Sequence, residues 1–289
     1  VLVADTVYDP CRKYCDAELK RLGVAVTYYD PMAGDEIGSL FQPNTKAIYL
    51  ESPGSMTFEV QDTRKLAEIA HQHGALVLAD CTWATPLAPS PFSLGIDVNI
   101  QALTKYACGH ADVLMGAITV KGKLAKQLET QYKHYGMNVS PDDCYLMLRG
   151  LRTLAVRVEQ QEQTGLKLAE WFKARPETRR VLHPAFESCP GHAHWKRDIG
   201  RSCGLFSVII DPYDKKALAA MFDGFKIFGM GFSWGGFESL LIALDPKSIR
   251  TAKPWVEEGV LLRIHAGLEA PEDLIAELEE GFKRLNAAA

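Results

Sequence analysis

The sequence lacks any long apolar run. No stretch approaches the roughly 20 consecutive apolar residues that a membrane-spanning helix needs. The opening VLVADTVYDP has neither the charged start nor the small-residue cleavage site of a signal peptide. We therefore expect no membrane partner and a cytoplasmic location.

An excess of charge of one sign is also missing. The chain has 32 Lys and Arg residues against 36 Asp and Glu residues, and the basic residues are scattered, so nucleic acid is not expected as a partner. The seven cysteines are an odd number without CxxC pairs, which argues against a disulfide framework. Reduced thiols are typical of a cytoplasmic protein.

What the first half does contain is a regular alternation of apolar strands and amphipathic helices. Helices are predicted over 11–22, ending at Gly23, and over 63–74, where Asp62 is placed to cap the start. Strands are predicted over 1–4, 24–30, 46–50, 75–80, 98–102 and 113–120. Continuous apolar strands separated by helices indicate an α/β fold, with a mostly parallel sheet covered by helices on both faces.

The second half has a different pattern. Ser140 followed by Pro141 and two acids predicts a helix start, and the helical pattern continues to Arg175 as one long helix. Shorter strands over 179–184, 204–210 and 261–268 and helices over 215–222 and 271–285 follow. We interpret residues 1–150 as a large domain and residues 151–289 as a smaller α+β domain.

Two charged residues follow neighbouring strands of the predicted sheet. Asp80 is the first polar residue after an apolar strand, and Lys105 follows the next strand. Because ligands bind beyond the carboxyl ends of parallel strands, both are expected on one binding edge. A partly desolvated lysine suits Schiff-base chemistry, and a buried aspartate needs a cation such as a protonated pyridine nitrogen. A capping aspartate and a solvated lysine are the alternative.

The residues around this pair resemble the Cys/Met-metabolism family of enzymes that use pyridoxal phosphate (PLP), and within it the cystathionine β-lyase branch. The most specific motif is Thr104-Lys105-Tyr106 followed by Gly109-His110. Further matches occur in family order along essentially the whole chain: TVYDP, YLESPGS, LADCTWATP, HPAFESCPGHAHWKRD, FSWGGFESL and LLRIHAGLE. The resemblance implies a type I PLP-dependent transferase-like fold.

The resemblance also implies roles for individual residues. Lys105 would hold the PLP aldehyde and act as the base. Asp80 would pair with the ring nitrogen, and Tyr8, placed with Lys105 among the catalytic residues, would stack on the ring. Thr82 would face the cofactor and Thr104 its phosphate. On the substrate side the implied residues are Arg263 for the carboxylate, Ser233 and Trp234.

The implied function is carbon–sulfur β-elimination of a small sulfur amino acid, cystathionine giving homocysteine, pyruvate and ammonia. Phe232 stands where synthase and γ-lyase relatives have a glutamate, and Ser55 where they have an asparagine, which favours β-elimination. The alternatives are a broader cysteine-S-conjugate β-lyase or cysteine desulfhydrase, a γ-lyase or γ-synthase, and a non-catalytic descendant that binds or regulates.

The chain departs from the family pattern in two places. Ala102 replaces a serine that contacts the phosphate. The Gly-rich phosphate turn, and the Tyr and Arg that a neighbouring subunit supplies, have no match, so we expect residues before Val1 in the natural protein. The resemblance implies a homotetramer built from dimers. A zinc site in the histidine-rich stretch 183–203 fits no tetrahedral ligand spacing.

Overall fold

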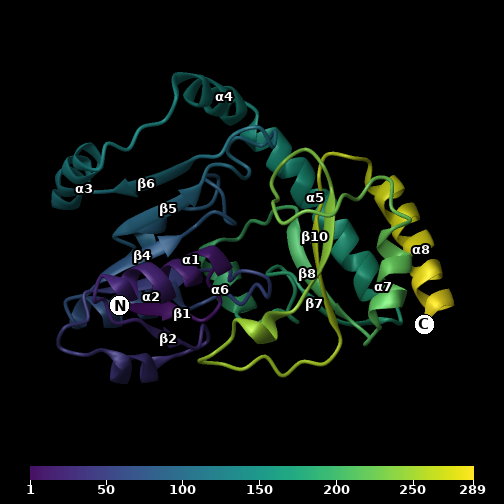
Figure 1. Cartoon of the computed structure of the whole chain (residues 1–289), viewed down its shortest axis with the longest axis horizontal. Coiled ribbons are helices and arrows are strands. Elements are labelled where there is room, and N and C mark those ends of the chain that lie inside the picture. Colours follow the sequence, from purple (N-terminus) through teal and green to yellow (C-terminus); the bar gives the residue numbers. More distant parts are fainter.

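The computed structural model describes residues 1–289 and contains two sheets, one from each half of the chain (Figure 1). The first sheet has the order β2-β1-β3-β4-β5-β6, in which only β6 runs antiparallel to its neighbour. Its strands are β1 (Leu2–Ala4), β2 (Thr27–Tyr29), β3 (Ala47–Glu51), β4 (Leu76–Asp80), β5 (Val98–Ala102) and β6 (Gly116–Val120). The prediction of a mostly parallel sheet is confirmed.

Two helices of the first half were predicted from their start and stop signals, and both are present. Helix α1 (Asp9–Tyr14) begins two residues before the predicted start, because an acid and a proline suit the first turn, and it continues as a π-helical turn, Cys15–Leu19. Helix α2 (Thr63–Gln72) packs against β3 and β4. The Asp62 carboxylate accepts a hydrogen bond from the Lys65 N–H, as its predicted capping role requires.

The prediction of one helix from Ser140 to Arg175 is wrong. The Ser140 cap is present, but α4 (Pro141–Leu151) and α5 (Leu154–Lys173) are separated at residues 152 and 153. The Arg157 guanidinium donates to the Gly150 carbonyl at 2.9 Å and to the Tyr106 carbonyl at 3.0 Å. The break therefore has a tertiary cause, because Arg157 ties the end of α4 to the segment that carries Lys105.

The second sheet is wholly antiparallel, with the order β7-β8-β10-β9. Its strands are β7 (Thr178–Leu182), β8 (Leu205–Ile210), β9 (Leu240–Leu244) and β10 (Val260–His265), of which β9 was not predicted. The remaining helices are α3 (Lys123–His134), α6 (His192–Asp198), α7 (Lys215–Phe222) and α8 (Pro271–Ala288), with 3₁₀ turns at Asp35–Leu40, Pro91–Leu94 and Pro246–Ser248. The predicted division at residue 150 falls inside α4 and stays a prediction.

Each sheet has its own apolar core, and a smaller cluster joins them. The first core gathers side chains of β1, β3, β4 and α2, and the second those of β8, β10, α5 and α8. In the joining cluster, Phe58, Trp83 and Tyr106 of the first half pack with Leu154 and Leu205 of the second. The Trp83 indole N–H donates to the Leu205 carbonyl at 2.9 Å, which fixes the two halves against each other.

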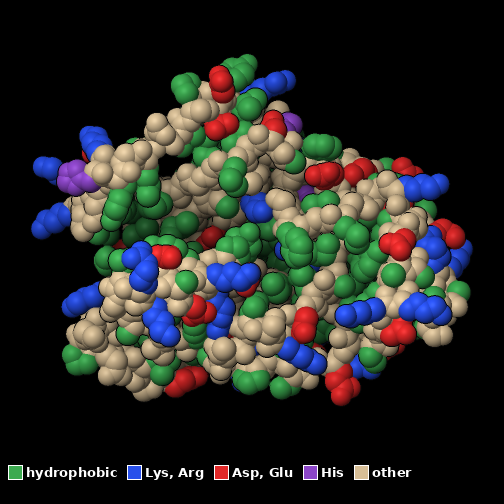
Figure 2. Space-filling view, viewed as in Figure 1, with side chains coloured by type: hydrophobic (Ala, Val, Ile, Leu, Met, Phe, Trp, Pro, Cys, Tyr) green, Lys and Arg blue, Asp and Glu red, His purple; other side chains and the backbone are tan.

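The first sheet is less covered at β6 than elsewhere. Ile118 on β6, and Tyr132, Tyr135 and Met137 on or after α3, are all exposed. Figure 2 shows apolar side chains gathered below α3. No helix of the chain is both long enough and apolar enough to cross a bilayer.

Candidate active site

A pocket lies at the carboxyl edge of the first sheet, where the two halves meet. Glu51 and Asp80 are the last residues of β3 and β4 and stand in register as Cα partners. Lys105 follows the end of β5 by three residues. The pocket is lined by Tyr8, Glu51, Pro53, Gly54, Ser55, Met56, Phe58, Asp80, Thr82, Trp83, Ala102, Lys105, Leu205, Trp234 and Arg263. The predicted pair Asp80 and Lys105 is thus brought together in one cavity.

Asp80 offers this pocket a carboxylate without a bonded cation. It accepts a hydrogen bond of 2.8 Å from the backbone N–H of Thr82, and it belongs to no ion pair of the chain. Burial raises the pKa of Asp80, while hydrogen bonds from Thr82 and the charge of Lys105 act in the opposite direction. A carboxylate in this position is stabilised by a cation that enters the pocket.

Lys105 extends from the other side of the pocket floor. Its Nζ donates a hydrogen bond of 2.9 Å to the Ser233 hydroxyl and lies 5.2 Å from the centre of a Trp234 ring. Burial, followed by the positive charge of Arg263, lowers the pKa of Lys105 to about 8, although Asp80 acts in the opposite direction. About a tenth of this amine is then unprotonated at pH 7, far more than for an ordinary lysine, and a nucleophile or a base must be unprotonated.

Glu51 is a pocket residue to which the sequence analysis assigned no role. Its Oε2 accepts a hydrogen bond of 2.7 Å from the Tyr8 backbone N–H. Burial, followed by the charge of Asp80, raises the pKa of Glu51 well above its usual range. Two neighbouring carboxyl groups cannot both ionise easily, so Glu51 is the one that holds a proton. Its position at a strand end, like that of Asp80, was the available signal.

The other predicted cofactor residues divide into two groups. Tyr8 lies at the pocket rim with 48% of its surface exposed, and Thr82 is buried, with its hydroxyl accepting from the Ala102 N–H at 2.9 Å. Thr104 lies beside the pocket rather than in its lining. The Thr104 hydroxyl donates to the Met115 carbonyl and accepts from the Met115 N–H, so binding a phosphate would cost it the donor bond.

The second half of the chain contributes the opposite wall. Arg263 on β10 is buried and donates from one guanidinium nitrogen to the carbonyls of Phe232, at 2.8 Å, and Gly231, at 3.3 Å. The remaining nitrogens are left to bind a carboxylate. Trp234 lines the pocket and Ser233 accepts from Lys105. The predicted substrate-side residues therefore lie on the wall that faces Lys105.

Gly235 explains how this wall approaches Lys105. Its φ is +81°, and an added Cβ would lie 2.6 Å from the Tyr106 nitrogen and 3.0 Å from the Lys105 Cα. The Gly235 N–H donates to the His265 Nε2 at 3.0 Å. Burial lowers the pKa of His265 to about 3, so the ring is neutral and can accept this bond. Neither Gly235 nor His265 was predicted as a site residue.

These residues fit PLP. The unpaired carboxylate of Asp80 suits a protonated ring nitrogen, the Lys105 amine suits an aldehyde, and Tyr8 offers an aromatic face at the rim. When bound, PLP supplies an electron sink for the carbanion that remains after an amino acid loses its α-proton.

The chain is similar to known proteins over nearly its whole length. The sequence profile described as "Cys/Met metabolism PLP-dependent enzyme" matches residues 1–283. The chain belongs to this family. Its predicted resemblance, enzyme class and PLP cofactor are confirmed.

Relatives in the family carry more than one name. The chain is 42% identical to a putative cystathionine β-lyase of Rhizobium johnstonii and 40% identical to the cystathionine β-lyase of Escherichia coli, over 99% of this chain and 73% and 74% of those proteins. An L-alanine/L-glutamate racemase of Wolbachia pipientis is also 40% identical, over 99% of this chain and 71% of its own.

A solved structure confirms the fold within the family. The crystal structure of cystathionine γ-synthase from Xanthomonas oryzae, in complex with aminoacrylate and cysteine, superposes with a TM-score of 0.91 at 29% identity. The match covers the whole of this chain and 76% of that one. The fold is therefore shared by β- and γ-acting enzymes, and the choice between reactions depends on the pocket.

Proposed function

We propose that the protein is a carbon–sulfur lyase that splits L-cystathionine, with water, into homocysteine, pyruvate and ammonia. The observation that carries the proposal is the position of Lys105, whose pKa is lowered to about 8 in a pocket that also contains Arg263 and Asp80. An amine of this kind takes a proton from Cα, and a guanidinium beside it holds the carboxylate on the same carbon.

Each pocket residue has a separate role in the proposed β-elimination. Arg263 binds and orients the α-carboxylate, so that the α-proton of the substrate faces Lys105. Lys105 accepts that proton, and the Ser233 hydroxyl, at hydrogen-bond distance from its Nζ, orients the amine. Asp80 keeps a positive charge at the ring nitrogen. Trp83, Phe58 and Trp234 restrict the access of water.

The distribution of acids supports β- over γ-elimination. The only acids that line the pocket, Glu51 and Asp80, stand at the strand ends on the cofactor side. Phe232, which stands in place of a glutamate, is not among the lining residues and is 77% exposed. The residues of the second half that line the pocket, Leu205, Trp234 and Arg263, therefore offer no carboxylate for a second proton transfer.

Amino-acid racemisation is the second candidate, because a 40% identical relative has that name. Racemisation also starts with loss of the α-proton, and it needs a donor that returns a proton to the other face of Cα. Tyr8 at the rim of the same pocket is the candidate for this donor.

One set of assays separates these reactions. The purified, PLP-loaded protein is given cystathionine, and pyruvate, 2-oxobutyrate and homocysteine are measured; L-alanine and L-glutamate are followed by chiral chromatography. Pyruvate with homocysteine is the expected result. 2-Oxobutyrate would indicate γ-elimination, and D-amino acids without pyruvate would indicate a racemase. Lys105→Ala should abolish turnover and the visible absorbance of bound PLP.

The residue roles, the cytoplasmic location and the homotetramer are part of this proposal. Light scattering of the purified protein at several concentrations tests the assembly.

A further inference from the structure

One wall of the pocket is made of strained backbone. Met56 and Phe58, which both line the pocket, have φ values of +67° and +59°. Non-glycine residues rarely adopt this left-handed region, and each such residue costs on the order of 1 kcal/mol or more. A segment of this kind persists only where its surroundings hold it, so the contacts around Thr57 decide the shape of the wall.

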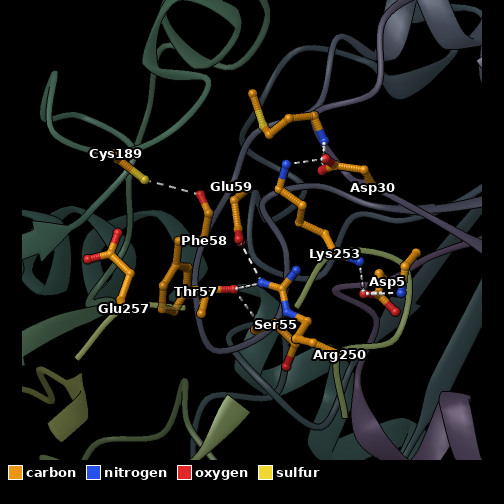
Figure 3. A network of polar contacts seen from close by, with 12 residues as sticks. Asp5, Asp30, Ser55, Thr57, Phe58, Glu59, Cys189, Arg250, Lys253 and Glu257 are labelled. Atoms are coloured by element: carbon orange, nitrogen blue, oxygen red, sulfur yellow. Dashed lines mark hydrogen bonds and ion pairs between the residues drawn. The ribbon is translucent and has the colours of Figure 1, made fainter. Parts of the chain in front are cut away.

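Those contacts come from the other half of the chain. Arg250, in the connection between β9 and β10, donates from one guanidinium nitrogen to the Thr57 hydroxyl at 2.5 Å and to the Glu59 carboxylate at 2.6 Å (Figure 3). Only 3% of the Arg250 side chain is exposed. The Cys189 thiol adds a bond to the Phe58 carbonyl at 3.2 Å. Buried charge-assisted bonds are the strong class of hydrogen bond.

The residues after Arg250 hold a second part of the pocket. The backbone N–H groups of Thr251, Ala252 and Lys253 converge on the buried carboxylate of Asp5 at 2.9–3.1 Å. Asp5 precedes Tyr8 by three residues, and Figure 3 shows it close to Arg250. The short segment 250–253 therefore connects the second sheet to two pieces of the pocket that are far apart in the sequence.

We propose that Arg250 is a positioning residue for the wall of this pocket that Met56 and Phe58 form. It holds Met56 and Phe58 in the conformation that shapes the apolar wall. It also fixes the position of that wall relative to the second sheet, which carries Arg263. The expected change in KM for cystathionine rests on the proposed function. Arg250 does not line the pocket, so its loss should weaken substrate binding and leave the bond between Lys105 and PLP intact.

The test compares four variants of the PLP-loaded protein. Arg250→Met removes the contact, and Arg250→Lys retains a charged donor on a side chain of similar length. Thr57→Val removes the hydroxyl that accepts the hydrogen bond from Arg250, with almost no change in the shape of the side chain. The matched control is Arg180→Met, because Arg180 pairs with Glu257 of the β9–β10 connection and donates to the Ser188 carbonyl, and no hydrogen bond or ion pair joins it to residues 55–59.

Two readouts are needed, and only one depends on catalysis. For cystathionine, Arg250→Met should raise KM by about tenfold or more, the loss expected for a buried charged hydrogen bond. Arg250→Lys should recover part of this loss. PLP content and absorbance should match the wild type. Hydrogen exchange of peptides covering residues 52–60 should become faster in Arg250→Met and Thr57→Val, but not in Arg180→Met.

Three outcomes would overturn the proposal: unchanged exchange over residues 52–60 in Arg250→Met; equal KM changes in Arg250→Met and Arg180→Met; or parallel loss of PLP, kcat and melting temperature without recovery by lysine. Should Arg250→Met fail to fold, Arg250→Lys and Thr57→Val decide by the same criteria. A wild-type protein that makes no pyruvate would refute the proposed function alone, because the exchange readout would still test the role of Arg250.

Discussion

The chemistry proposed for the site depends on the proton held by Lys105. Its pKa falls from an ordinary value of 10.5 to about 8, first because of burial and second because of Arg263, while Asp80 acts against both. The difference of about 2.5 pH units corresponds to roughly 3 kcal/mol. Replacing each charged neighbour should therefore move this pKa in a defined direction.

Arg263→Met should raise the pKa of Lys105 above 8 but leave it below 10.5, because the remaining burial outweighs the effect of Asp80. Asp80→Asn should lower it below 8. Each shift should be on the order of one pH unit. The measurement is the pH dependence of amine acylation at Lys105 in the PLP-free protein, followed by mass spectrometry, with Arg180→Met as a control that leaves the value unchanged. A fall in Arg263→Met, or a rise in Asp80→Asn, would refute this account of the site.

Three further predictions concern stability and the neighbouring acid. Lys105→Met should stabilise the PLP-free protein at pH 7 by up to a few kcal/mol. The reason is that the pKa of Lys105 is lower in the native state than in the unfolded state, so the native state is penalised whenever the amine is charged, below about pH 8. The stability gained by Lys105→Met should therefore shrink between pH 8 and 10.5. Thermal melts at several pH values measure this dependence. His265→Leu should cost about 1–3 kcal/mol by leaving the buried Gly235 N–H unpaired, whereas His265→Gln, which offers an acceptor at similar reach, should cost less in urea unfolding. Burial also lowers the pKa of His265 from 6.5 to about 3, so the stability that depends on neutral His265 is lost as the pH falls from 6.5 towards 3. Glu51→Gln should change kcat/KM at pH 7 by less than about threefold, since the amide mimics a protonated acid and still accepts from Tyr8; a tenfold loss would mean that Glu51 works as an anion.

The sequence was sufficient to predict the helix caps and the strand ends that form the edge of the pocket. Asp62 and Ser140 cap their helices as their sequence neighbours indicate. Asp80 and Lys105 meet because parallel strands bring their carboxyl ends to one edge, which is a rule of topology. Tyr8 and Thr82 reach the pocket for the same reason.

What the sequence did not reveal depends on contacts between distant residues. The break between α4 and α5 follows from the hydrogen bond of Arg157 to Tyr106, 51 residues away. Arg250 bonds to Thr57 across 193 residues, and no periodicity or cap signal marks such a partner. Thr104 matched a motif, but its hydroxyl is bonded to Met115, which only the folded chain shows.

The crowding at Gly235 limits how this pocket can be redesigned. There is no room for a methyl group between this residue and the backbone of Lys105, so the two main chains are packed directly against each other. New substrate preferences are therefore accessible through the Trp234 side chain, which lines the pocket, whereas shifting the loop itself would displace the amine that we propose as the base. Any side chain at Gly235 would push this loop away from the segment that carries Lys105, so this position should not tolerate substitution.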